Sequence, residues 1–210
     1  METLTVSKRL LRRLPIYLNY IKALPEETEN VSASKIAKAL DLGDVLVRKD
    51  LAKVSDGGRR KLGYNRNVLI RDIEEFLDMN STTCAVVVGA GKLGQALLDY
   101  EGFERSGMHI LAGFDINPSG KKTDGGKPIY PMNRLTAYCQ NNDVSIGILT
   151  VPAGNAQDIC NHLVASGVNA IWNFSAAHLS VPDDVIVQTE NLAVSLTSLR
   201  VQIKNRDKHR

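Results

Sequence analysis

Three glycines in the middle of the chain form a pattern that suits phosphate binding. They follow the apolar run 84–88, which reads as a buried strand, and precede a helix expected over 95–100. The first glycine of such a loop permits a sharp turn, the second lets the backbone approach a pyrophosphate, and the third lets the helix pack closely on the sheet. The loop reads Gly89-Ala90-Gly91-Lys92-Leu93-Gly94. We therefore expect a dinucleotide-binding loop here.

An acidic residue after the next strand narrows the choice of dinucleotide. Asp115 ends the strand expected at 109–115, about 20 positions beyond the last glycine, where a carboxylate can hold the ribose hydroxyls of an adenosine. Its charge repels a 2′-phosphate, and no arginine follows in 116–118. The pattern predicts NAD rather than NADP as the cofactor.

Helices and apolar strands continue to alternate after this unit. The expected elements are a helix at 134–141, a strand at 144–150, a helix at 156–166 and strands at 170–174 and 185–188. This alternation predicts an α/β fold with a doubly wound parallel sheet, which binds ligands at the carboxyl ends of its strands. Thr150, Val151 and Pro152 are therefore expected at the site. Phe174 is expected either to stack near the nicotinamide or simply to fill the edge of the sheet.

The N-terminal part of the chain concentrates positive charge. Residues 32–66 carry nine basic and four acidic side chains, a density that suggests a polyanion as the partner. An amphipathic helix is expected at 8–24, a short helix capped by Ser32 ends at the turn 42–43, and a basic helix follows at 45–54. A tight glycine turn between a short helix and a basic helix is typical of a helix-turn-helix.

The basic helix and the segment after it predict a DNA-binding surface. We expect the helix to bury Val45 or Leu46 together with Leu51 and Val54. Its exposed arc then carries Arg48, Lys49 and Lys53. The glycine-punctuated segment 55–64 reads as a wing, a short hairpin that carries Arg59, Arg60 and Lys61. Cationic side chains on a recognition helix and on a neighbouring wing can hold DNA phosphates.

The polar residues 80–83 mark a linker. We expect a winged helix-turn-helix domain at 1–80, a Rossmann domain at 81–190 and a C-terminal helix at 191–210. Leu192, Leu196, Leu199 and Ile203 form an apolar stripe on this last helix. Such a stripe needs a partner surface.

A catalytic role is not expected. Residues 81–190 leave room for a dinucleotide fold and little else, whereas dehydrogenases usually add a substrate domain with acid/base groups. None of the four histidines has an evident catalytic setting. We interpret the chain as a nucleotide sensor joined to a DNA binder and not as an enzyme. A small NAD-dependent oxidoreductase is the alternative.

Composition argues against several other classes. The apolar stretches fall far short of the ~20 residues that cross a bilayer, so no membrane association is expected. Residues 1–8 lack the features of a secretion signal, which predicts a cytoplasmic location. The three cysteines are odd in number and far apart, which fits neither a disulfide framework nor a metal site. We expect all three in the core.

Segments along nearly the whole chain resemble the Rex family of redox-sensing transcriptional repressors. The segments keep the order and approximate spacing of that family. They are Arg13-Leu14-Pro15-Ile16-Tyr17-Leu18, Val31-Ser32-Ala33-Ser34, Val47-Arg48-Lys49-Asp50-Leu51, Gly63-Tyr64-Asn65, Val88-Gly89-Ala90-Gly91-Lys92-Leu93-Gly94, Ala112-Gly113-Phe114-Asp115, Gly147-Ile148-Leu149-Thr150-Val151-Pro152-Ala153, Asn173-Phe174 and Leu192-Ala193-Val194.

The resemblance implies a homodimer in which each C-terminal helix is swapped against the partner. It also implies binding to inverted-repeat operator DNA when NADH is low and release when NADH is high. The switch would involve Arg13 and Tyr100, and the dimer contacts would involve Asn191, Leu192, Leu196 and Leu199. The residues expected at the DNA are Arg9, Ser32, Ser34, Arg48, Lys49, Lys53, Arg59, Arg60, Lys61 and Tyr64.

Two positions depart from the family pattern. The loop 53–58 has no aromatic residue, which predicts a different operator preference. Asn191 stands where the family often has an aspartate that pairs with the switch tyrosine or arginine. A neutral amide cannot form that ion pair, so the chain could also be a DNA-binding paralogue with a weakened NADH switch or one that keeps its nucleotide permanently bound.

Overall fold

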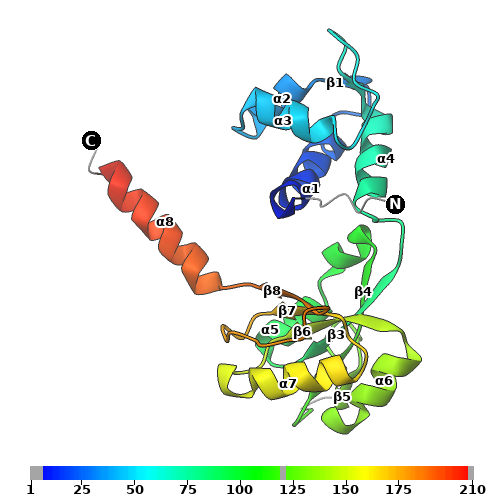
Figure 1. Ribbon diagram of the computed structural model, residues 1–210, viewed down its shortest axis with the longest axis vertical. Helices are drawn as coiled ribbons and strands as arrows, with labels where there is room; N and C mark the ends of the chain where they lie inside the picture. The colour runs from blue at the N-terminus through cyan, green and yellow to red at the C-terminus, as the bar shows by residue number, and fades with distance from the viewer. Residues whose placement is uncertain (1–6, 119–121, 208–210) are drawn as a thin grey trace. The chain divides into compact units, whose positions relative to one another are not determined.

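The computed structural model describes residues 7–118 and 122–207 (Figure 1). Contacts along the chain divide it into two compact units, Met1–Ser81 and Thr82–Arg210. Each unit has its own hydrophobic core. The predicted separation of residues 191–210 from the Rossmann domain stays a prediction. No helix among the described residues is long and apolar enough to cross a membrane.

Short helices and a small sheet build the first unit. Its elements are α1 (Lys8–Lys22), β1 (Asn30–Val31), α2 (Ala33–Ala39), α3 (Asp44–Leu51), β2 (Tyr64–Asn65) and α4 (Arg66–Phe76). The apolar faces meet in one core, in which Tyr17, Ile36 and Leu51 are fully buried. Ser32 caps α2 as predicted, because its hydroxyl accepts a 3.1 Å hydrogen bond from the backbone N–H of Lys35.

The segment after α3 forms the predicted short hairpin. Arg59 and Gly63 exchange backbone hydrogen bonds of 2.8 and 2.9 Å, which place 60–62 at the tip of a turn. Lys61 and Gly63 have left-handed backbone angles, with φ of 70° and 84°. A side chain at Gly63 would also lie 2.5 Å from the carbonyl oxygen of Val31, so β1 approaches the hairpin too closely for any other residue.

A parallel sheet dominates the second unit, as predicted, but it has six strands where the sequence pattern indicated five. Its strands are β3 (Thr83–Val88), β4 (Met108–Asp115), β5 (Ile129–Pro131), β6 (Val144–Leu149), β7 (Ala170–Asn173) and β8 (Ile186–Thr189). They are arranged in the order β5-β4-β3-β6-β7-β8. The chain moves outward from β3 in both directions, so the carboxyl ends of β3 and β6 flank the crevice where such sheets bind ligands.

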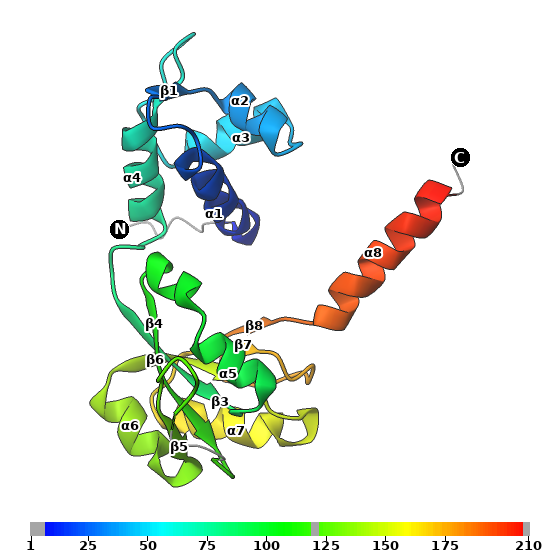
Figure 2. The same ribbon diagram turned by 180° about the vertical axis from the view of Figure 1, so that it is seen from behind.

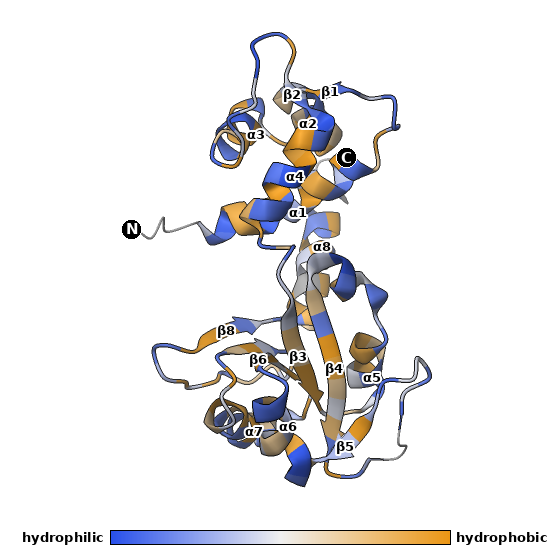
Figure 3. Ribbon diagram, turned by 90° about the vertical axis from the view of Figure 1, so that its right-hand side faces the viewer, coloured by the Kyte–Doolittle hydropathy of each residue, from blue (hydrophilic) through white to orange (hydrophobic). Residues whose placement is uncertain are grey.

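Helices cover both faces of this sheet (Figure 1 and Figure 2). They are α5 (Lys92–Leu98), the 3₁₀ turns η1 (Glu101–Ser106) and η2 (Met132–Arg134), α6 (Leu135–Asn141) and α7 (Ala153–Ala165). Val86 and Val88 of β3 pack in one core with α6 and α7, whereas Ala85 and Val87 pack in another with α5. Because β3 is buried on both faces, its residues are apolar almost throughout, as Figure 3 shows.

The last helix is apolar on two sides. α8 (Leu192–Asp207) includes the predicted stripe of Leu192, Leu196, Leu199 and Ile203. At about 100° per residue, Val194 and Val201 lie on the opposite side of the helix. All of these apolar side chains are more than half exposed. α8 therefore exposes two opposed apolar surfaces, one of which the sequence pattern did not reveal.

Candidate functional site

The three motif glycines occupy sterically different positions. Gly89 has a φ of 99°, and a side chain there would lie 2.9 Å from the backbone of Thr150. A side chain at Gly94 would overlap the carbonyl oxygen of Gly89. At Gly91 an added Cβ would meet nothing within 4 Å. Gly89 and Gly94 are thus required by the fold itself, whereas the space beside Gly91 is open to a ligand.

The Asp115 carboxylate is held beside this loop. One carboxylate oxygen accepts a 2.8 Å hydrogen bond from the N–H of Ala90, and the other accepts a 2.8 Å bond from the N–H of Asn117. Thr150 supports the loop from β6, because its hydroxyl donates to the carbonyl oxygen of Gly89 at 2.6 Å. Ala90 of the glycine loop and Asp115 are 25 positions apart in the sequence but are neighbours in space.

A cavity of about 440 Å³ opens at this carboxyl edge of the sheet. Six of the predicted cofactor residues line it: Gly89, Gly91, Asp115, Thr150, Val151 and Pro152. The predicted residues Ala90, Lys92, Leu93, Gly94 and Phe174 are not among its described lining residues. Phe174 is half-buried and packs on Trp172, with ring centroids 4.6 Å apart. The structure thus places Phe174 with the aromatic cluster on the sheet, while its contact with nicotinamide stays a prediction.

Seven further lining residues were not predicted as cofactor contacts from the sequence. They are Val88, Phe114, Ile116, Met132, Asn155, Asp158 and Ile159. A signal existed for the last three, because they lie three and four positions apart on the helix that follows Pro152, on one face of that helix. The apolar members can pack against a flat ring such as adenine.

The recognition helix is rotated relative to the expectation. Its buried residues are Val47, Asp50 and Leu51, while Val45 and Leu46 are 64% and 38% exposed. The prediction that Val45 or Leu46 would be buried was therefore wrong, and α3 ends at Leu51 rather than at Val54. The reason is that a carboxylate, Asp50, takes a core position. Arg48, Lys49 and Lys53 are exposed, as expected.

Asp44 brings two of the predicted DNA residues together. Its carboxylate accepts a 2.5 Å hydrogen bond from the hydroxyl of Ser34 on α2 and a 2.6 Å bond from Nη2 of Arg48, one turn further along α3. The backbone of Gly43 begins the helix, so Asp44 is its first residue and links α2 to α3. The sequence pattern did not identify this link.

A groove of about 560 Å³ lies between the helix-turn-helix and the wing. The predicted DNA residues that line it are Ser32, Ser34, Arg48, Arg59, Arg60, Lys61 and Tyr64. Tyr64 is buried, and burial raises the pKa of its hydroxyl while the charge of Arg48 lowers it. The predicted residues Arg9, Lys49 and Lys53 lie outside the described lining of the groove. The structure therefore brings helix and wing cations to one concave surface.

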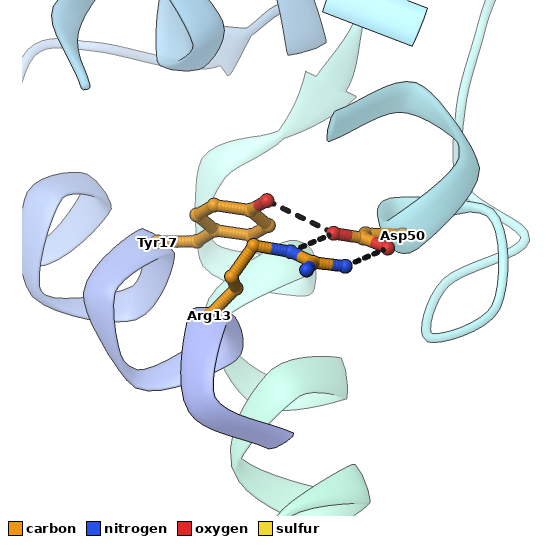
Figure 4. Close-up of polar contacts among 3 residues, drawn as sticks. All are labelled: Arg13, Tyr17 and Asp50. Carbon is orange, nitrogen blue, oxygen red and sulfur yellow. Dashed lines mark hydrogen bonds and ion pairs between the residues drawn. The ribbon is translucent and has the colours of Figure 1, made fainter. Parts of the chain in front are cut away.

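The predicted switch residue Arg13 is engaged within the first unit (Figure 4). Its Nε and Nη2 donate to the two carboxylate oxygens of Asp50 at 2.7 and 2.9 Å, and the hydroxyl of Tyr17 donates to the same carboxylate at 2.9 Å. The hydrogen bond with Asp50 raises the pKa of Arg13. Burial, together with that carboxylate, raises the pKa of Tyr17 to about 12.

The other predicted switch residues belong to the second unit. Tyr100 is 61% exposed and meets Phe103 edge-on, with ring centroids 4.9 Å apart. The side-chain oxygen of Asn191 accepts a 3.1 Å hydrogen bond from the N–H of Val194, so this amide caps the start of α8. The participation of Arg13, Tyr100 and Asn191 in a switch stays a prediction. No group of three or more potential metal ligands occurs in the described part of the chain.

Two family models match this chain. One describes a CoA binding domain and covers residues 80–177, and the other describes a putative DNA-binding protein N-terminus and covers residues 5–52. The redox-sensing transcriptional repressor Rex of Porphyromonas gingivalis is 38% identical over 202 residues, which are 95% of this chain and 93% of that protein. The chain belongs to the Rex family. The Rex repressor of Treponema denticola is 40% identical, over 93% of this chain and 94% of its own.

Solved structures of a Rex-family repressor called RSP have the same fold. RSP in complex with beta-NAD⁺ and operator DNA matches with a TM-score of 0.88 and 31% identity, over 97% of this chain and 95% of RSP. RSP in complex with beta-NADH matches with a TM-score of 0.87 and 31% identity, over 98% and 97%. The predicted combination of a DNA-binding unit and a Rossmann-like unit is thus confirmed as the Rex architecture.

Proposed function

We propose that this chain is a redox-sensing repressor that binds inverted-repeat operator DNA as a homodimer and leaves it when NADH rises relative to NAD⁺. The observation that carries the proposal is the presence, in one Rex-family chain, of an open glycine-loop cavity and a cationic groove between a recognition helix and a wing. A ligand that binds the two states of such a protein differently shifts it between them.

The cavity suits NAD(H). The open space at Gly91 supports a close approach of the backbone to the pyrophosphate, and the carboxylate of Asp115 in the cavity lining can accept hydrogen bonds from the adenosine ribose. Ile116, Met132 and Ile159 supply an apolar surface for the adenine ring. The charged side chains among its described lining residues are the carboxylates of Asp115 and Asp158, which disfavour the additional phosphate of NADP.

The same cavity supports sensing rather than catalysis. Its described lining contains no histidine, cysteine, lysine or tyrosine. These side chains, together with Asp and Glu, most often exchange a proton with a substrate. Of the two carboxylates in the described lining, Asp115 is held by the backbone N–H groups of Ala90 and Asn117, and we assign it to the ribose. We therefore propose that the nicotinamide is bound and not consumed, and that the protein is not an enzyme.

Because a repressor must reach chromosomal DNA, we propose a cytoplasmic location.

The groove in the first unit suits duplex DNA. Arg48 from the helix and Arg59, Arg60 and Lys61 from the hairpin line one concave surface. Lys49 and Lys53 add charge on the exposed side of α3. Long cationic side chains from two elements can follow the two phosphate backbones that border a major groove.

A second copy of the chain is the partner that α8 requires. Leu192, Leu196, Leu199 and Ile203 lie on one side of this helix and Val194 and Val201 on the other, all of them exposed. Two opposed apolar stripes call for a position between two surfaces. We propose that α8 takes such a position in the partner subunit, as the family resemblance implies.

The test is a fluorescence-anisotropy titration of the full chain onto a labelled inverted-repeat duplex at fixed salt, with no nucleotide, with saturating NAD⁺ and with saturating NADH. We expect specific binding that NADH abolishes and NAD⁺ leaves intact. Specific binding that neither nucleotide changes would instead indicate a disabled switch. The neutral amide of Asn191 supports that alternative. Absence of specific binding would contradict the proposal.

A further inference from the structure

The outward face of α3 carries an apolar side chain among cations. Val47, Asp50 and Leu51 define the buried side of this helix. At about 100° per residue, the opposite side passes through Val45 and Lys49. Val45 is 64% exposed, so its branched side chain lies near the centre of the outward face, with Lys49 beside it.

Position distinguishes Val45 from other exposed aliphatic residues. Isolated apolar side chains are common on protein surfaces and usually need no explanation. Val45, however, is the second residue of a recognition helix, and in helix-turn-helix proteins the N-terminal residues of that helix contact base edges. A β-branched side chain there cannot donate or accept a hydrogen bond, so it can discriminate bases only through apolar contact.

The link through Asp44 fixes the polar surroundings of Val45. The Asp44 carboxylate accepts hydrogen bonds from Ser34 and Arg48, which compensates a negative charge that would otherwise face phosphates. Arg48 is held through Nη2, and its remaining guanidinium N–H groups are available to DNA. A fixed arginine and an exposed valine therefore lie within one turn of each other.

We infer that Val45 reads thymine in the operator, through contact between its methyl groups and the 5-methyl group of the base. This inference rests on the proposed DNA-binding function and adds a specificity determinant to it. The thymine methyl is the apolar group that base pairs display in the major groove. Burying one methyl group is worth about fourfold in affinity, the equivalent of about 0.8 kcal/mol.

The test removes the methyl group from the DNA and the valine from the protein. A fluorescein-labelled inverted-repeat duplex selected by the full chain from a random library serves as the probe. Each thymidine of one half-site is replaced in turn by deoxyuridine, which keeps the hydrogen-bonding edge and lacks only the methyl group. We expect about fourfold weaker binding by the wild-type protein at one thymidine, and no further loss there for Val45→Ala.

A matched control comes from α1. Ile16 is 51% exposed in the same unit but lies outside α3 and the wing, so Ile16→Ala should keep the full sensitivity to deoxyuridine. If Val45→Ala stayed as sensitive as wild type at every thymidine, or if no replacement weakened wild-type binding, the inference would be wrong while the proposed function stood. If no duplex were selected at all, the proposed function would fail and the inference with it.

Discussion

Arg13 on α1 forms a two-pronged ion pair with Asp50 on α3, with N–O distances of 2.7 and 2.9 Å. Asp50 is only 4% exposed and also accepts the hydroxyl of Tyr17. A buried carboxylate needs such partners because burial without them costs several kcal/mol. The first helix thereby fixes the position of the recognition helix.

Replacing Arg13 with alanine should destabilise the first unit by about 2–3 kcal/mol, because Asp50 then keeps a buried charge with Tyr17 alone. Urea unfolding of the full chain followed by circular dichroism measures the change. Arg12→Ala removes an exposed neighbouring cation and should shift the transition by less than about 0.5 kcal/mol. Equal midpoints for the two variants would show that the ion pair adds nothing.

Replacing Gly91 with alanine should separate folding from nucleotide binding. An added Cβ meets no protein atom within 4 Å, so the unfolding midpoint should stay at the wild-type value. The same Cβ occupies the space that the glycine loop leaves for a pyrophosphate. The affinity for NADH, measured by nucleotide fluorescence, should therefore fall at least about tenfold. Gly154→Ala, equally unhindered but outside the cavity lining, should bind normally. Normal NADH binding by Gly91→Ala would refute the assigned cofactor site.

Replacing Arg59 and Arg60 together with alanine should weaken binding to all duplexes and flatten its salt dependence. Each lost phosphate contact lowers the slope of log K against log salt by about 0.9. The control is Arg71→Ala, since Arg71 is exposed on α4 and lies outside the described lining of the groove. An unchanged slope in the double variant would remove the wing from the DNA contacts.

The two buried cysteines should not respond to oxidants. Burial raises the pKa of Cys139 to about 11 and also raises that of Cys160. Both therefore remain thiols at pH 8, where the thiolate of Cys139 amounts to about one molecule in a thousand. In a Cys84→Ser variant, a disulfide reagent should find no fast-reacting thiol in the native protein and two after denaturation. A rapid native reaction would contradict this expectation.

The raised pKa of Cys139 also predicts the sign of a pH effect. Because the folded state holds the proton more tightly than the unfolded state, its contribution to stability is complete below about pH 8.5 and is lost as the pH rises toward 11. Cys139→Ala should therefore lose less stability than wild type over that interval, as unfolding midpoints at pH 8 and pH 10 would show.

The glycine loop and Asp115 could be predicted because their signals are local. A strand, three glycines and a terminal carboxylate follow one another within 35 residues, and each has a steric or electrostatic reason that needs no distant partner. The cavity lining at Met132 carried no such signal, because it depends on how η2 lies at the carboxyl edge of the sheet.

The rotation of α3 could not be predicted because its cause lies far away in the chain. Asp50 looks like a surface residue until Arg13 and Tyr17, 37 and 33 positions earlier, are placed against it. When Asp50 is assumed to be exposed, the sequence pattern puts the buried face of α3 at Val45 and Leu46. Phe174 was similarly undecided, because only the sheet places Trp172 against its ring.

The opposed apolar stripes of α8 have a consequence for how repression depends on the concentration of the protein. If Leu192 and Val201 are shielded from water only when two chains associate, then active repressor forms in proportion to the square of the free chain concentration at low abundance. Operator occupancy would then fall more steeply than protein level when a dividing cell dilutes its contents. The helix would make the amount of protein a second input to the regulator, alongside the nucleotide ratio.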